Sequence, residues 1–136
     1  MTTKEYLSRA YYLDMRIRSK AMQIAELETL ATKVSAALSP IKVQTSKDNH
    51  KMESTVIKMH EYQEELDNDM KKLIQVKRET KEIIDTVSND EYRVLLELRY
   101  LSSMRWEEIA VEMNYSIDHV FRLHRRALKA VKLPAA

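Results

Sequence analysis

The sequence contains no glycine, although an average chain of its 136 residues would carry roughly nine or ten. Tight β-hairpin turns need residues at positive φ, which glycine adopts most easily. Phosphate-binding loops and dinucleotide-binding fingerprints are also built on glycine. The absence of glycine therefore argues against sheet-rich folds and against the common nucleotide-binding enzymes.

Cysteine is absent as well, and proline occurs only at Pro40 and Pro134. Without cysteine the chain has no disulfide framework and no thiolate metal site, which fits a reducing cytoplasm. The first residues, Met1–Glu5, lack the apolar stretch of a signal peptide, and the longest apolar run is Ala10–Leu13. We therefore expect a helical protein of the cytoplasm, with no membrane contact.

Two long segments repeat apolar residues in alternating steps of three and four, the pattern of a heptad seam. In the first segment, about 3–38, with Lys20 counted in the series, the apolar positions are Ala10, Leu13, Ile17, Ile24, Leu27, Ala31, Val34 and Leu38. In the second, about 49–87, the seam positions are Met52, Val56, Met59, Gln63, Leu66, Met70, Leu73, Lys77, Thr80, Ile84 and Val87, with Tyr62, Val76 and Ile83 widening the stripe. Ser39-Pro40 is expected to end the first helix, and 39–49 to form a polar linker in which Ser46 or Asp48 caps the second. A short connection between long helices predicts an antiparallel helical hairpin.

Three shorter helices are expected at about 90–101, 105–113 and 117–131. Ser88 and Glu91 have the spacing of a capping box at the first of them. The predicted fold is all-α, with the long hairpin over residues 1–88 and a small three-helix domain over residues 89–136.

Within the small domain, five residues fit a helix-turn-helix. Ala110 supplies a small side chain where two helices touch, and Asn114 tolerates positive φ in the sharp turn. Ser116 is placed to cap the following helix, whose Val120 and Leu123 point back into the core. An ordinary helical corner has a similar pattern and remains the alternative.

Charge is concentrated on the last predicted helix. The chain has a formal net charge of +2, but residues 117–132 carry five basic side chains against the single acid Asp118. On a helical wheel, Asp118 shares the face opposite the apolar one with Arg122, Arg125 and Lys129, and His119 and Arg126 lie at its edge. The second helix of a helix-turn-helix enters the major groove of DNA, where arginine binds guanine or phosphate. A solvated basic face is the alternative interpretation.

Here the chain resembles a known family. Residues 91–101, Trp106–Ala110 and Ser116–Lys129 resemble the opening helix and the helix-turn-helix of sigma factor region 4. The whole chain is similar to short phage and prophage proteins of low-GC Gram-positive bacteria, described as sigma-factor-like or as relatives of the ArpU and RinA late-gene regulators.

The resemblance implies that the start of the last helix reads promoter DNA and that host RNA polymerase is a partner. Carried over by position, the DNA-binding residues are Ile117, Asp118, His119, Phe121 and Arg122, with Arg125 and Arg126 toward phosphate. Lys129 lies further along the same helix, where phosphates are also expected. Two positions depart from the family pattern. Arg105 stands where a Ser or Thr helix cap is usual, so the cap is lost or Ser103 replaces it, and Ile117 stands where a polar base reader is common.

The sequence thus predicts a phage-type transcriptional regulator that binds double-stranded DNA, with no catalytic site, metal or cofactor. The apolar stripe of 49–87 is wider than one partner helix needs, so a homodimer is expected. One alternative is a DNA-packaging subunit like a small terminase, which joins a helix-turn-helix to helices that assemble rings. Another is a coiled-coil interaction protein that does not bind DNA.

Overall fold

The computed structural model describes residues 1–37 and 46–134, and the side chains of residues 1–33 and 50–134. All of its regular structure is helical; no strand occurs in these residues, which confirms the all-α prediction. The chain divides into two compact units, one of Asp14–Lys71 and one that joins Met1–Leu13 to Lys72–Ala136. No helix in the described ranges is both long enough and apolar enough to cross a membrane.

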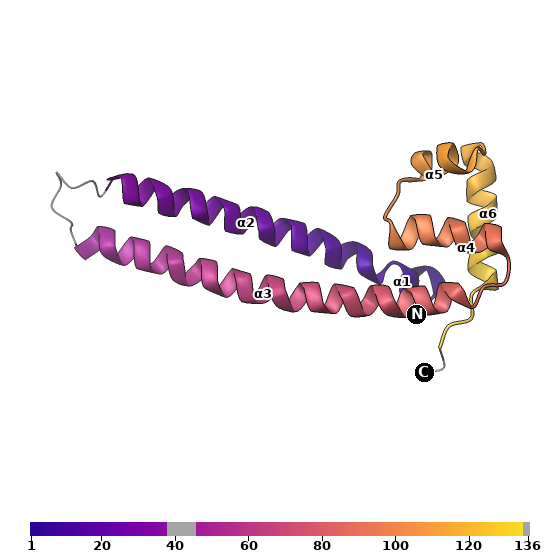
Figure 1. Ribbon diagram of the computed structural model, residues 1–136, viewed down its shortest axis with the longest axis horizontal. Helices are drawn as coiled ribbons and strands as arrows, with labels where there is room; N and C mark the ends of the chain where they lie inside the picture. The colour runs from indigo at the N-terminus through magenta and orange to yellow at the C-terminus, as the bar shows by residue number, and fades with distance from the viewer. Residues whose placement is uncertain (38–45, 135–136) are drawn as a thin grey trace. The chain divides into compact units, whose positions relative to one another are not determined.

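Two long helices, α2 (Arg9–Ala37) and α3 (Ser46–Asp85), run side by side in opposite directions (Figure 1). Within the unit of Asp14–Lys71, Arg16 pairs with Asp69 and Lys20 pairs with Glu65. The pairing advances four residues along α2 as it retreats four along α3, which defines an antiparallel register. The predicted end of the first helix at Pro40 lies outside the described residues, as do the side chains of Val34, Leu38 and the proposed caps. The second helix starts at Ser46, inside the segment predicted as linker.

The predicted seam of α3 is wrong at alternate positions. Val56, Gln63 and Met70 are exposed, whereas their N-terminal neighbours Thr55, Tyr62 and Asp69 are buried or half-buried. Likewise, Val76 is buried and Lys77 is only half-buried. Because a helix is rigid, the packing of Tyr62 and Val76 toward α2 fixes the rotation of α3 about its own axis. Asp69 therefore lies in the seam, where Arg16 is its partner.

Most of the other unit packs around one apolar core, and a smaller cluster of Ala10, Leu13 and Val76 joins α2 to α3. The fully buried side chains of the larger core come from every helix of the unit except α2 and include Leu7, Ile84, Val87, Leu95, Leu96, Ile109, Val120, Leu123 and Ala127. The first predicted helix is interrupted here, because α1 (Thr3–Leu7) ends at Ser8 before α2 begins. The side chain of Thr2 accepts a hydrogen bond from the backbone of Glu5, and Glu5 accepts one from the backbone of Thr2, which completes a capping box.

The remaining helices lie close to their predicted ranges. They are α4 (Asp90–Leu96), a π-helical turn η1 (Glu97–Leu101), α5 (Trp106–Met113) and α6 (Ile117–Ala130). The predicted cap at Ser88 is wrong by one residue. Asn89 is the N-cap of α4, and its side chain accepts a hydrogen bond of 3.0 Å from the backbone N–H of Tyr92.

Candidate nucleic-acid interface

A tight turn without glycine joins α5 to α6. Asn114 adopts the left-handed conformation, with φ 60° and ψ 44°, which confirms the positive φ predicted there. The backbone N–H of Tyr115 donates to the carbonyl of Ala110 at 3.0 Å, and that of Asn114 donates to the carbonyl of Val111 at 3.2 Å. These two bonds form a Schellman motif, which satisfies carbonyls that the end of α5 would otherwise leave unpaired. The small Ala110 is buried at this corner, as predicted.

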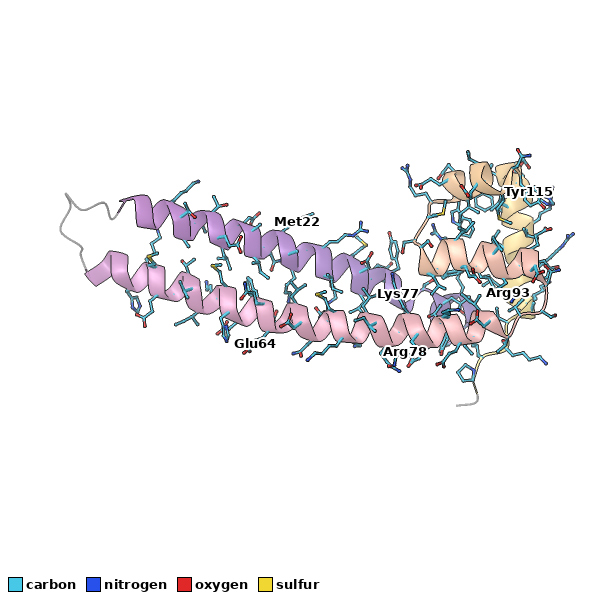
Figure 2. The ribbon with its side chains drawn as sticks, viewed as in Figure 1. Met22, Glu64, Lys77, Arg78, Arg93 and Tyr115 are labelled. Atoms are coloured by element: carbon cyan, nitrogen blue, oxygen red, sulfur yellow. The ribbon has the colours of Figure 1, made fainter. Side chains whose placement is uncertain are left out.

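The start of α6 is fixed by side chains on both sides of the turn. Ser116 is the N-cap, as predicted, and its hydroxyl accepts from the backbone N–H of His119. The ring of His119 meets that of Tyr115 edge to face, with centroids 4.4 Å apart. A hydrogen bond to Glu91 raises the pKa of Tyr115, so Tyr115 also ties the turn to the start of α4. Figure 2 labels Tyr115 at this corner.

One face of α6 lies in the core. Val120 and Leu123 are buried, as predicted, and Ala127 and Val131 are buried beside them. The sequence did not single out His124, which is also buried on this side and only 7% exposed.

His124 belongs to an aromatic cluster beneath α6. Its Nε2 lies 2.6 Å from the hydroxyl of Tyr100, and its ring centroid lies 4.5 Å from that of Trp106. Burial, with the charges of Lys4, Arg99 and Arg125 adding to it, lowers the pKa of His124 to about 4. Burial raises the pKa of Tyr100 to about 12. Both groups are therefore neutral at pH 7, and the pair links η1 to α6 without burying a charge.

Trp106 extends this cluster toward the surface. Its ring meets Phe121 edge to face at 5.6 Å, and the guanidinium of Arg99 lies 4.5 Å from its centroid. Trp106 thus packs against the core. Phe121 is 37% exposed, so one side of its ring supports the domain and the other remains accessible.

The opposite face of α6 is exposed and predominantly basic. It presents the remaining predicted site residues, Asp118, Arg122, Arg125, Arg126 and Lys129. No ion pair joins any of these side chains to another residue in the part of the chain that the structure describes. Ile117, at the first turn, is 36% exposed, and His119 is half-buried against Tyr115. The eight predicted residues therefore fall into an exposed charged face and a flanking set, Ile117, His119 and Phe121, that is partly packed.

Arg105 is the N-cap of α5 but makes no side-chain cap hydrogen bond. Its Nε instead donates to Glu108 at 2.7 Å, so the cap expected from the family pattern is lost and Ser103 does not replace it.

Among the described residues, no group of three or more His, Asp or Glu side chains is arranged to hold a metal ion. His60 pairs only with Glu64, one turn away on the surface.

Sequence reasoning missed the break that separates α1 from α2. Leu7 is 1% exposed in the same core as α6, and α1 packs against α6. The signal was available, because Thr2 and Glu5 have capping-box spacing and mark a helix start that is separate from the heptad pattern.

Residues 33–132 match a family model described as a protein of unknown function, DUF1492. The chain belongs to this family. The matched region of DUF1492 contains α3, the turn after α5 and all of α6, and it begins after α1. No curated protein and no solved structure matches the chain.

Proposed function

We propose that this protein is a phage-type transcriptional regulator that binds promoter DNA with α6 as the recognition helix of a helix-turn-helix. The observation that carries the proposal is the exposed face of α6. It carries four cations, which are Arg122, Arg125, Arg126 and Lys129. None of them forms an ion pair with an acidic residue in the described part of the chain. A basic face whose charges have no internal partner is suited to an anionic ligand.

The packing of α6 supports this proposal. Recognition helices need a rigid base, because base contacts depend on a fixed register in the groove. The Schellman turn at Asn114, the cap at Ser116 and the buried face of α6 provide such a base. The only exposed acid on this helix, Asp118, lies in its first turn, where its negative charge interacts favourably with the positive end of the helix dipole.

The same helix divides into two zones. Arg122 lies within two turns of the N-terminus, where side chains reach base edges in the major groove. Arg126 and Lys129 lie further along, where the groove wall and phosphates are expected. We therefore assign base reading to the first half, including Asp118, and phosphate binding to the second.

The long hairpin is proposed to dimerise the protein, and host RNA polymerase is the proposed target. Exposed apolar side chains on the unit of Asp14–Lys71 include Met15, Met22, Leu30, Val56, Ile57 and Met70. Two copies joined through such side chains would present two recognition helices to paired half-sites.

The decisive experiment is to sequence DNA recovered with the tagged protein from its host and to titrate the enriched and scrambled duplexes by fluorescence anisotropy at several salt concentrations. We expect Arg122→Ala to relax sequence preference by about 1–3 kcal/mol, the value of a lost bidentate base contact.

Arg126→Ala and Lys129→Ala should weaken binding to every duplex and each lower the salt slope by about 1, because each contact releases counterions. Asp118→Ala should raise non-specific affinity and lower discrimination.

The matched control is Lys72→Ala, an exposed lysine of α3 in the same compact unit, which should leave binding unchanged. If all four changes on α6 leave affinity and salt slope as they are in the wild type, α6 does not enter DNA. The interaction-protein interpretation would then replace the proposal.

A further inference from the structure

The first helix is an integral part of the unit that contains α6. α1 packs against α6, and Leu7 is buried in the same apolar core as Val120 and Leu123. The capping box of Thr2 and Glu5 fixes the start of α1, with bonds of 3.1 and 3.2 Å. The position of α1 beside α6 is thus set both by packing and by local hydrogen bonds (Figure 1).

The register of α1 places one cation at the edge of its buried face. At about 100° per residue, Lys4 lies roughly 60° around the helix from the buried Leu7, at the edge of the packed face. Glu5 lies roughly 160° from Leu7, on the far side, and its carboxylate is held by the capping box. Lys4 is exposed, and no ion pair is recorded for it with any residue that the structure describes.

Two other cations lie near the same part of α6. The charges of Lys4, Arg99 and Arg125 all act on His124, so all three lie near this residue of α6. Arg99 is occupied, since it lies over Trp106 and donates to the carbonyl of Met104 at 2.9 Å. Lys4 and Arg125 remain available to an external anion.

We propose that Lys4 binds the phosphate backbone of the duplex that α6 reads, so that the interface spans two helices from opposite ends of the chain. This inference rests on the proposed function of α6. The chemistry is that of a point charge on a flexible stem, which is suited to a phosphate and carries no base specificity. α1 therefore supplies affinity and orientation, and α6 supplies the sequence preference.

The test compares Lys4→Ala, Lys4→Glu and the control Lys72→Ala, with wild-type protein and Arg126→Ala as references. The probe is a mixed-sequence duplex of about 30 base pairs, titrated by fluorescence anisotropy across a salt series. Lys4→Ala should weaken binding about fivefold near 0.1 M salt and lower the salt slope by about 1, and Lys4→Glu should weaken it further. Lys72 is twelve residues before the core residue Ile84, about 18 Å along α3, so its removal should change neither quantity.

The outcomes separate the two proposals. If Arg126→Ala weakens binding but both Lys4 variants match the wild type, α6 binds DNA and α1 does not. If no variant and no wild-type sample binds the duplex, the function proposed for α6 itself fails. Thermal unfolding followed by circular dichroism should be unchanged in Lys4→Ala, since no recorded ion pair is removed, so a lower affinity would report lost contact with the phosphate.

Discussion

At the scale of single residues, the most informative side chain is His124, which no sequence motif marked. It is an ionisable group in the core of α6, held neutral by burial and by three nearby cations. Its hydroxyl partner Tyr100 comes from η1, so the pair joins two elements through residues that are 24 positions apart in the sequence. A neutral imidazole and a neutral phenol share one hydrogen bond here, which satisfies both groups without a charge.

His124 makes stability depend on pH in a defined direction. Its pKa is about 4 in the folded protein against an ordinary value of 6.5, so the unfolded chain binds the proton more readily. Stability is therefore full above pH 6.5 and is lost as the pH falls toward 4, by up to about 1.4 kcal/mol per pH unit. Urea unfolding of wild type and His124→Gln between pH 4 and 7.5 checks this. The Gln variant should show a flatter profile, and parallel profiles would contradict the assignment.

At the scale of elements, the turn between α5 and α6 shows how a chain without glycine makes a sharp corner. Asn114 takes the left-handed conformation that glycine usually supplies, since its short polar side chain tolerates positive φ better than other residues do. The carbonyls of Ala110 and Val111 are then satisfied by the Schellman bonds.

Substitution at Asn114 should separate backbone conformation from side-chain chemistry. Asn114→Ala should destabilise the protein by about 1–2 kcal/mol, because a Cβ group without a compensating polar atom disfavours positive φ. Asn114→Gly should stay within about 0.5 kcal/mol of the wild type, since glycine has no such restriction. Chemical denaturation measures both. Equal losses for the two variants would mean that the Asn side chain, and not the backbone conformation, stabilises the turn.

At the scale of the whole molecule, the structure groups residues from both ends of the chain. The boundary between the hairpin and the small domain was predicted at residue 88, whereas the compact unit around α6 draws in Met1–Leu13 and Lys72–Val87. Leu7, Ile84 and Val87 each have 3% exposure or less in its core.

A fragment of residues 89–136 tests the predicted boundary directly. We expect it to unfold with low cooperativity, because it lacks three fully buried side chains, each contributing about 2–5 kcal/mol when a large core residue is truncated. The full chain should unfold cooperatively under the same conditions. Circular dichroism during thermal unfolding distinguishes the two, and a fragment that is stably folded and binds DNA would restore the boundary at 88.

We also expect the whole molecule to assemble as a dimer. Light scattering should give a mass of about twice the 16.1 kDa chain. Val56→Glu with Met70→Glu should shift it to the monomer with helicity retained, because both side chains lie outside the hairpin seam. The matched control, Gln63→Glu, changes an exposed position that is already polar. A mass of 16.1 kDa at all concentrations would refute the dimer, and a ring-sized mass would favour the packaging-subunit alternative.

The sequence alone determined the secondary structure closely, because its signals are local. The heptad spacing and the residues Asn114 and Ser116 each favour a conformation within one or two turns of the chain. The structure has its helices and its turn where these signals, together with the lack of glycine, predicted them. Only the tertiary structure decided the rotation of α3 and the composition of the core around α6. The rotation depends on how all seam residues pack at once, which placed Asp69 inside and Met70 outside. The core depends on contacts between Leu7 and residues more than 70 positions away, and no local pattern encodes such contacts.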